Sequence, residues 1–220
     1  MYNVLLSKVD EGLNDEKIQS RLKKIINSNM KLLIFPWSFP VELDEKQLDD
    51  FFEKRRLKFI APFVRLGIKE EKIYVANCYR DTKKDLIKKI KQSDILFFTG
   101  GNPEMLFSKV VHKMELLYEI KHYEGIIIGE SAGALMQFER YFITKKNNFY
   151  PYFAFYDGFG NLSNPFYIDV HSVNKKLYMD KLKEVAHNYN KNIYAIYNNG
   201  AIIYNRKNGE LELFGKVDKI

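Results

Sequence analysis

The stretch GIIIGESAGA, residues 125–134, decides the fold. Its first half, 125–128, is a continuous apolar run of the kind that forms a strand buried on both faces. Ser131 and a series of small residues follow at once. This is the Gly-x-Ser-x-Gly pattern, in which a serine occupies a tight strand-to-helix turn and exposes its hydroxyl at the carboxyl edge of a sheet. The stretch predicts an α/β sheet with a nucleophilic serine at that edge; the alternative interpretation is a packing turn of small residues.

On both sides of this stretch, apolar runs alternate with charged segments of helical period. Continuous apolar strands separated by amphipathic helices indicate a mostly parallel sheet covered by helices on both faces, a three-layer α/β sandwich. Residues 145–165 are rich in Asn, Phe, Tyr and Gly, show no clean period, and are predicted to form a long functional loop. The predicted strands are 3–6, 31–36, 72–76, 94–98, 125–128, 166–170, 193–196, 201–205 and 210–214, and the predicted helices are 15–26, 44–66, 82–93, 102–123 and 175–188.

Length and composition limit the class of protein. The chain has 220 residues, of which 46% are hydrophobic, and this excludes a disordered chain. We find no internal repeat and no Pro/Gly/Ser-rich linker, so a single domain over residues 1–220 is expected. The one cysteine, Cys78, excludes an internal disulfide framework and a multi-cysteine zinc site. No export signal and no apolar run of roughly 18 residues are visible, so we expect a cytoplasmic protein with no membrane partner.

The net charge of +7, from 35 basic and 28 acidic residues, raises the possibility of a nucleic-acid partner. The basic residues are scattered over predicted amphipathic helices, where a solvated polar face is the ordinary interpretation. No basic-aromatic or zinc-finger spacing is present. We therefore expect no nucleic-acid binding. We also expect no metal or other cofactor, because serine chemistry needs none.

A second motif, Thr-Gly-Gly-Asn at 99–102, also follows an apolar strand and precedes a helix. Two glycines at this point leave backbone N–H groups facing the carboxyl edge of the sheet, where ligands bind in open α/β folds. The alternative is a glycine turn with Asn102 as the helix N-cap and Pro103 as the first helical residue. Both interpretations can hold together.

The chain has four histidines, and their surroundings differ. His112, His122 and His187 lie in lysine-rich helical segments. His171 ends a predicted strand, with Asp169 two residues before it on the same face. A structural histidine is the alternative at this position, but a nucleophilic serine needs a base, and this makes His171 the preferred candidate.

The ordered motifs resemble the peptidase E and cyanophycinase family of serine peptidases, which share the flavodoxin-like fold of the class I glutamine amidotransferases. The resemblance rests on the segments 99–102 and 129–134, on Gly-Phe-Gly at 158–160, and on Asp-x-His at 169–171, and it spans about residues 31–203. A glutaminase of the same fold normally carries a cysteine at the elbow, where this chain has Ser131.

The resemblance implies a serine peptidase of the dipeptidase E type. It implies that Ser131 is the nucleophile, that His171 is the general base, and that the backbone N–H groups of Gly101 and Ala132 form an oxyanion hole. It implies a short peptide substrate, with an N-terminal aspartyl residue as the candidate specificity. We expect a monomer or a homodimer.

The sequence departs from the family in three places. The family usually has a triad acid shortly after the serine, but the window 145–150 holds no carboxylate, which leaves Asp157 and Asp169 as candidates. Lys175 and Lys176 stand where the family has arginines, and together with Asn102 they are predicted to bind substrate. The segment Tyr-Asn-Asn-Gly, 197–200, replaces an acidic motif near the closing strands. A degenerate member acting as a binding or regulatory protein is therefore the alternative to an active enzyme.

Overall fold

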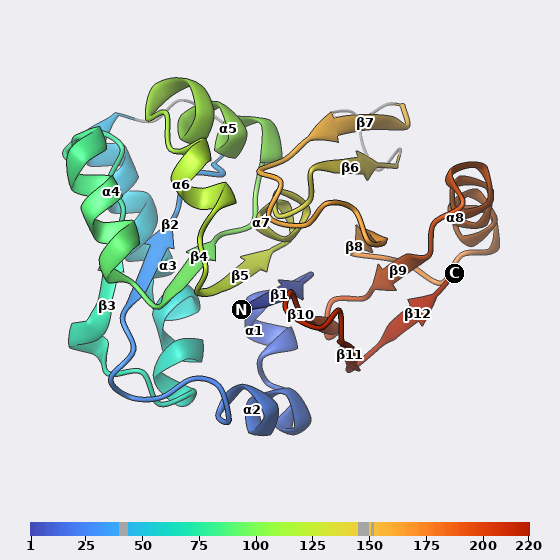
Figure 1. Ribbon diagram of the computed structural model, residues 1–220, viewed down its shortest axis with the longest axis horizontal. Helices are drawn as coiled ribbons and strands as arrows, with labels where there is room; N and C mark the ends of the chain where they lie inside the picture. Colours follow the sequence, from blue (N-terminus) through green and yellow to red (C-terminus); the bar gives the residue numbers. More distant parts are fainter. Residues whose placement is uncertain (40–43, 145–149, 151) are drawn as a thin grey trace.

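The computed structural model describes residues 1–39, 44–144, 150 and 152–220. Its centre is a seven-stranded sheet in the order β11-β10-β1-β5-β4-β2-β3 (Figure 1). The strands from β1 to β3 in this order run parallel, while β10 and β11 are antiparallel to their neighbours. The strands are β1 (Tyr2–Leu6), β2 (Leu32–Phe35), β3 (Ile73–Val75), β4 (Ile95–Phe98), β5 (Ile126–Glu130), β10 (Ala201–Asn205) and β11 (Leu211–Phe214). The mostly parallel α/β sandwich predicted from the sequence is confirmed.

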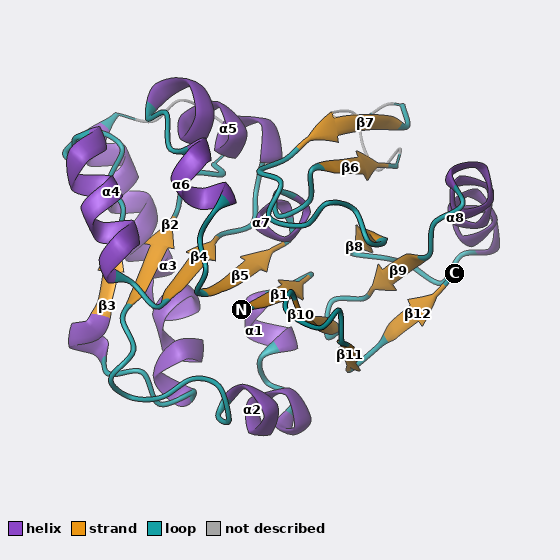
Figure 2. Cartoon of the chain, viewed as in Figure 1, coloured by secondary structure: helices purple, strands orange, loops and turns teal. Residues whose placement is uncertain are grey.

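Helices cover both faces of this sheet (Figure 2). One face packs against α1 (Val9–Gly12), α2 (Glu16–Leu22) and α3 (Glu45–Arg65), and the other against α4 (Lys83–Gln92), α5 (Pro103–Phe107), α6 (Leu117–Lys121) and α7 (Ala132–Leu135). The start of α4 is set by a capping box, in which Thr82 and Asp85 each satisfy the other's backbone N–H. In the described ranges, none of the helices combines the length and the apolar character needed to cross a bilayer.

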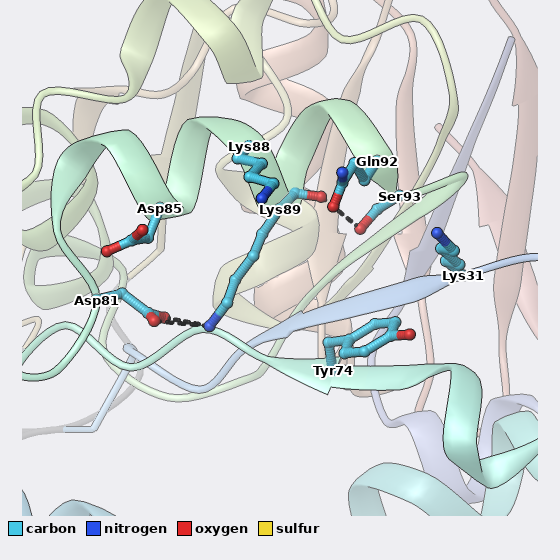
Figure 3. Close-up of a pocket in the computed structure, with 8 residues that line it drawn as sticks. All are labelled: Lys31, Tyr74, Asp81, Asp85, Lys88, Lys89, Gln92 and Ser93. Atoms are coloured by element: carbon cyan, nitrogen blue, oxygen red, sulfur yellow. Dashed lines mark hydrogen bonds and ion pairs between the residues drawn. The ribbon is translucent and has the colours of Figure 1, made fainter.

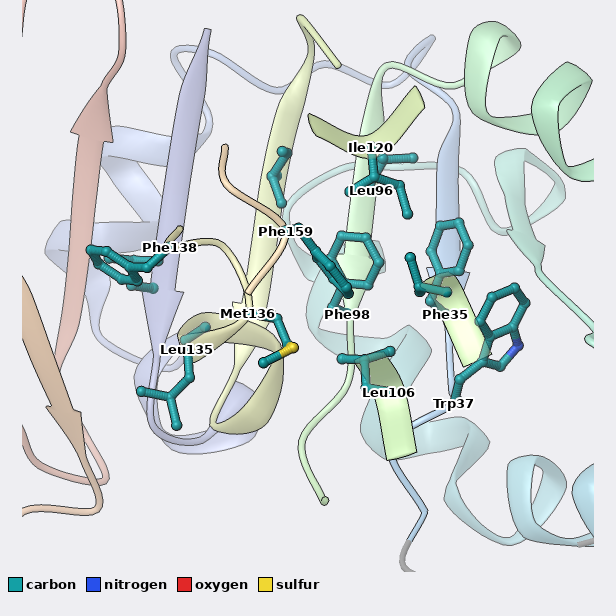
Figure 4. Close-up of a cluster of buried hydrophobic side chains, with 14 of the residues drawn as sticks. Phe35, Trp37, Leu96, Phe98, Leu106, Ile120, Leu135, Met136, Phe138 and Phe159 are labelled. Carbon is teal, nitrogen blue, oxygen red and sulfur yellow. The ribbon is translucent and has the colours of Figure 1, made fainter. Parts of the chain in front are cut away.

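The core follows from the two-residue period of the buried strands. Leu32 and Ile34 of β2 pack toward α1–α3, and Leu33 and Phe35 pack toward α4–α7. Figure 4 shows the second cluster, in which Phe98 lies between Phe35, at 4.9 Å between ring centroids, and Phe159, at 5.3 Å. Aromatic pairs at these separations add about 0.5–1.5 kcal/mol each beyond the burial of their area.

The single long helix predicted over 102–123 is wrong. The segment is divided into α5, a π-helical stretch (Ser108–Lys113) and α6. Between the π-helical stretch and α6, Glu115 takes the left-handed conformation, with φ of 51°. Leu116 is then fully buried, and its N–H donates to the Val110 carbonyl over 2.8 Å. The break keeps Leu116 on the buried side, so the spacing of apolar residues along 102–123 still looks like that of one helix. The sequence pattern therefore does not reveal the break.

The loop predicted over 145–165 contains a strand. Residues 145–149 and 151 lie outside the described part of the chain. β7 (Ala154–Asp157) pairs antiparallel with β6 (Arg140–Ile143). Tyr141 and Tyr156 face each other across this pair and stack at 5.6 Å between ring centroids. The strands are short, and their aromatic side chains pack on both faces, which hides the alternation expected of a strand.

A separate three-stranded sheet, β12-β9-β8, lies beside the central sheet, at the right in Figure 1. It consists of β8 (Tyr167–Val170), β9 (Ile193–Ile196) and β12 (Val217–Lys219), and β12 was not predicted. Leu182 and Val185 of α8 (Lys176–Tyr189) pack against it. The strand predicted over 166–170 is therefore confirmed as β8, but it lies outside the central sheet, because β8, which precedes His171, belongs to this smaller sheet.

Candidate active site

Ser131 lies at the sharp turn between β5 and α7, with φ of 50° and ψ of −109°. This is a sparsely populated backbone conformation for a residue other than glycine. The Ser131 N–H is held by the Leu6 carbonyl at 2.8 Å. The flanking glycines are required by space, because a Cβ on Gly129 would lie 2.2 Å from the Gly133 oxygen, and one on Gly133 would lie 2.1 Å from the Phe98 oxygen. The local sequence therefore fixes the elbow.

His171 follows β8 and faces this serine. Its Nε2 lies 2.9 Å from Ser131 Oγ. The backbone of His171 is also in the left-handed region, with φ of 55°. Its N–H donates to Ser7 Oγ over 2.9 Å, and the Ser7 hydroxyl donates in turn to the Ile196 carbonyl over 2.7 Å. Ser7, fully buried at the end of β1, thus joins the two sheets beneath the histidine.

Asn198 is the other partner of the imidazole. Its Oδ1 lies 2.9 Å from His171 Nδ1. It stands in the turn between β9 and β10, which is closed by the Gly200 N–H donating to the Tyr197 carbonyl over 2.8 Å. Because a side-chain amide oxygen can only accept, Nδ1 carries the proton and Nε2 directs its lone pair at Ser131 Oγ. The array Ser131–His171–Asn198 therefore has the tautomer that a general base needs.

The prediction of Asp157 or Asp169 as the partner of His171 is corrected by this geometry. Within the described residues, the ring nitrogens of His171 hydrogen-bond to Ser131 and Asn198. Asp157 is exposed at the end of β7. The buried carboxylate of Asp169 accepts from Tyr178 Oη over 2.6 Å and from Ser172 Oγ.

The reason lies in the backbone at the end of β8. Residues two apart, such as Asp169 and His171, lie on the same face of a strand only if the strand extends over both of them. The strand ends at Val170, and the left-handed conformation of His171 breaks this alternation, so the imidazole meets Ser131 and Asn198 although Asp169 lines the same cavity. Burial raises the pKa of the Tyr178 hydroxyl far above its ordinary value, and the Asp169 carboxylate raises it further. Asp169 therefore forms part of a structural network with α8.

The 99–102 loop lies against the elbow. Asn102 is the N-cap of α5, where its Oδ1 accepts from the Met105 N–H over 3.1 Å. The backbone N–H of Asn102 donates to the Ser38 carbonyl over 2.5 Å, and Ser38 Oγ lies 2.7 Å from the Gly100 oxygen. The capping interpretation of this motif therefore accounts for the Asn102 side chain, which was predicted to bind substrate. Ser38, three residues after the end of β2, is a supporting residue that the sequence analysis missed.

Glu130, the residue before the serine, was also missed. Its buried carboxylate accepts from the Gly100 N–H and from the Val9 N–H, each over 3.2 Å, and pairs with Lys58 Nζ at 2.9 Å. Three satisfied contacts offset the cost of burying the charge. Glu130 thereby ties α1, α3 and the 99–102 loop to the elbow.

A cavity of about 180 Å³ opens beside Ser131 and His171. We call it the β6 pocket, and its lining includes Gly101, Ala132 and the apolar residues Pro103, Leu135, Phe142 and Val170. Gly101 and Ala132, the predicted oxyanion donors, thus border the same space as the serine. Lys175 and Lys176 are exposed at the start of α8 and are not among the residues that line the pocket.

A larger hollow, of about 420 Å³, lies away from this site along β3 and α4 (Figure 3). Lys89 reaches across it to Asp81, with Nζ 2.7 Å from each carboxylate oxygen, so these two charges neutralise each other. In the parts of the chain that the structure describes, no group of three or more His, Cys, Asp or Glu side chains is arranged to hold a metal ion.

Residues 42–212 match the model of peptidase family S51. The chain belongs to peptidase family S51. Membership of this family makes it a serine-type peptidase. No curated protein sequence matches the chain.

Two solved structures share the fold. A candidate peptidase E protein from Listeria monocytogenes EGD-e superposes with a TM-score of 0.61 at 18% identity, covering 97% of this chain and 97% of its own. A peptidase from an acI-B1 Actinobacterium gives a TM-score of 0.65 at 15% identity, covering 100% of this chain and 93% of its own. At 18% and 15% identity, the two structures show that this S51 family member shares their fold.

Proposed function

We propose that this S51 peptidase hydrolyses short peptides with Ser131 as the nucleophile and His171 as the general base. The observation that carries the proposal is the 2.9 Å separation of Ser131 Oγ from His171 Nε2, together with the Asn198 contact that fixes the tautomer. Nε2 accepts the hydroxyl proton while Oγ attacks the carbonyl carbon, and the imidazolium then donates this proton to the leaving amine. Water activated by the same nitrogen hydrolyses the acyl-enzyme.

The negative charge on the tetrahedral intermediate needs donors close to Ser131. Ala132 is the first residue of α7, so its N–H has no acceptor inside the helix, and Gly101 borders the same pocket. These two N–H groups are the candidates, and one such donor typically contributes about 2.7–4 kcal/mol to transition-state stabilisation. Glu130 supports this arrangement, because its bond to the Gly100 N–H holds the loop against the elbow.

Two measurements test the proposal. A fluorophosphonate probe should label the wild-type protein and leave Ser131→Ala unlabelled. Hydrolysis of a dipeptide panel, with N-terminal Asp compared against Asn, Ala and Leu, should be lost in both Ser131→Ala and His171→Ala. Ser172→Ala serves as the control, since Ser172 contacts the Asp169 network and not the His171 ring. Peptide hydrolysis that survives in Ser131→Ala would exclude Ser131 as the nucleophile.

A second candidate function is binding without catalysis. It is favoured by one observation, that His171 is oriented by the neutral Asn198 and not by a carboxylate. An amide can fill this role in catalytic triads on other folds, so the neutral partner does not by itself exclude activity. A wild-type protein that binds peptides but reacts with no fluorophosphonate would support the binding role.

A further inference from the structure

A second hollow, of about 350 Å³, also reaches Ser131 and His171, from the side of α3. We call it the α3 pocket, and its lining includes Lys8, Phe51, Arg55 and Lys58. The serine and histidine therefore stand between two pockets of different character. Most of the described residues that line the β6 pocket are apolar or small, none is a lysine or arginine, and one, Asp169, is a carboxylate. The α3 pocket has three cationic side chains and one carboxylate, Glu130.

Two of the three cations in the α3 pocket are already paired. Lys8 Nζ lies 2.6 Å from Glu11 Oε1. Lys58 Nζ lies 2.9 Å from Glu130 Oε1, and that carboxylate is buried. Each ammonium thus has a carboxylate within hydrogen-bond distance, which lowers its attraction for a further anion.

Arg55 differs from both lysines. Among the described residues, none of the carboxylates pairs with its guanidinium, which stacks on the Phe51 ring with Cζ 4.0 Å from the ring centroid. Stacking engages the face of a guanidinium and leaves the N–H donors at its edge available. A planar group with free edge donors matches a carboxylate in a bidentate contact.

We infer that Arg55 is a specificity-determining residue that binds a carboxylate of the peptide substrate in the α3 pocket while Ser131 attacks the scissile bond. The inference rests on the proposed function. Two groups of a short peptide could supply this carboxylate, the free C-terminus and an acidic side chain. The β6 pocket then receives an apolar part of the same substrate.

The test uses four dipeptides that separate the two sources: Asp-Phe, Asn-Phe, and the C-terminal amide of each. kcat and KM are measured for wild type, Arg55→Gln and Arg55→Lys. The control is Arg56→Gln, which removes the same charge from the next residue of α3, where Arg56 pairs with Glu70 outside the pocket. Because Arg55 and Arg56 are both exposed, each variant should keep the wild-type circular dichroism spectrum and melting temperature.

For peptides that carry the recognised carboxylate, Arg55→Gln should raise KM by about 10- to 160-fold, the range of a charge-assisted hydrogen bond. The same variant should leave KM unchanged for the matched peptide in which this carboxylate is replaced by an amide. Arg55→Lys should restore part of the loss in affinity. A loss in both free acids, with the amides spared, identifies the C-terminus. A loss in both aspartyl peptides, with the asparaginyl peptides spared, identifies the side chain.

Equal effects of Arg55→Gln on all four peptides, or an effect no larger than that of Arg56→Gln, would overturn the inference while the peptidase proposal stands. A wild-type protein that hydrolyses none of the peptides and reacts with no fluorophosphonate would instead overturn the proposed function, and the inference with it. The two failures are therefore distinguishable.

Discussion

The contact between Asn198 and His171 makes the most direct prediction. Asn198→Ala removes the Oδ1 atom that lies 2.9 Å from Nδ1 and leaves this N–H without its partner in a half-buried site. The imidazole becomes positively charged in the transition state, and a hydrogen bond to a charged group contributes about 1.5–3 kcal/mol. At about 1.4 kcal/mol for each factor of ten, kcat/KM should fall by about 10- to 160-fold.

The assay is the hydrolysis of the best dipeptide of the panel, followed under conditions that report kcat and KM separately. The fall should lie in kcat, because Asn198 acts on the base and lies outside the lining of both pockets. Asn199→Ala is the matched control, since Asn199 occupies the next position of the same turn with an exposed side chain. It should keep the wild-type kcat.

A carboxylate at the same place sharpens the test. Asn198→Asp offers an acceptor to Nδ1 and adds a negative charge that stabilises the imidazolium. This variant should retain hydrolysis, and the acidic limb of its pH–kcat/KM profile should move to higher pH. The orienting role of Asn198 is refuted if Asn198→Ala and Asn199→Ala have the same kcat, or if Asn198→Asp is as inactive as the alanine variant.

Three further outcomes are expected. Ser7→Ala removes the hydroxyl that joins the two sheets beneath the histidine, so it should lower kcat with little change in KM, and should lower the free energy of unfolding in urea by about 1–3 kcal/mol. Both Gly101 and Gly209 have a positive φ, of 146° and 74°, but Gly101→Ala would place a Cβ 2.0 Å from the Ser38 carbonyl oxygen, whereas the Cβ of Gly209→Ala would meet nothing closer than 3.9 Å. Gly101→Ala should therefore abolish hydrolysis and lower the melting temperature far more than Gly209→Ala. Phe98→Ala should destabilise the protein by about 3–5 kcal/mol in urea, because the ring is fully buried between two other aromatic rings. A Gly209→Ala melting temperature as low as that of Gly101→Ala, or urea midpoints unchanged in Ser7→Ala or Phe98→Ala, would contradict the corresponding argument.

The helices and strands that the sequence predicted well are those with local signals. The helix predicted over 82–93 is α4, Lys83–Gln92, with Thr82 as its cap. A cap and an apolar stripe need only neighbouring residues, so a single sequence contains them. The break at Glu115 and the strand β12 have no such signal, since each depends on what the segment packs against.

The supporting residues of the site divide in the same way. Asn198 stands 27 residues after His171 in the chain, in a segment that replaces an acidic motif of the family. That replacement was the signal that could have pointed to it. Ser7 directly follows β1 and Glu130 ends β5, both at the carboxyl edge of the sheet, but nothing in the sequence tells which hydroxyl or carboxylate there will support the site.

By itself, the sequence determined that this protein is an α/β sandwich with Ser131 at a strand-to-helix elbow. The physical reason is local, because an apolar strand followed by glycines is what lets a short helix approach the sheet closely. Only the tertiary structure decided the partners of the serine. The histidine follows a strand of a second sheet, the amide of Asn198 contacts its other ring nitrogen, and Arg55 of α3 lines a cavity that reaches both catalytic candidates. These depend on how two sheets and a helix meet, and such contacts between distant segments leave no periodic trace in the chain.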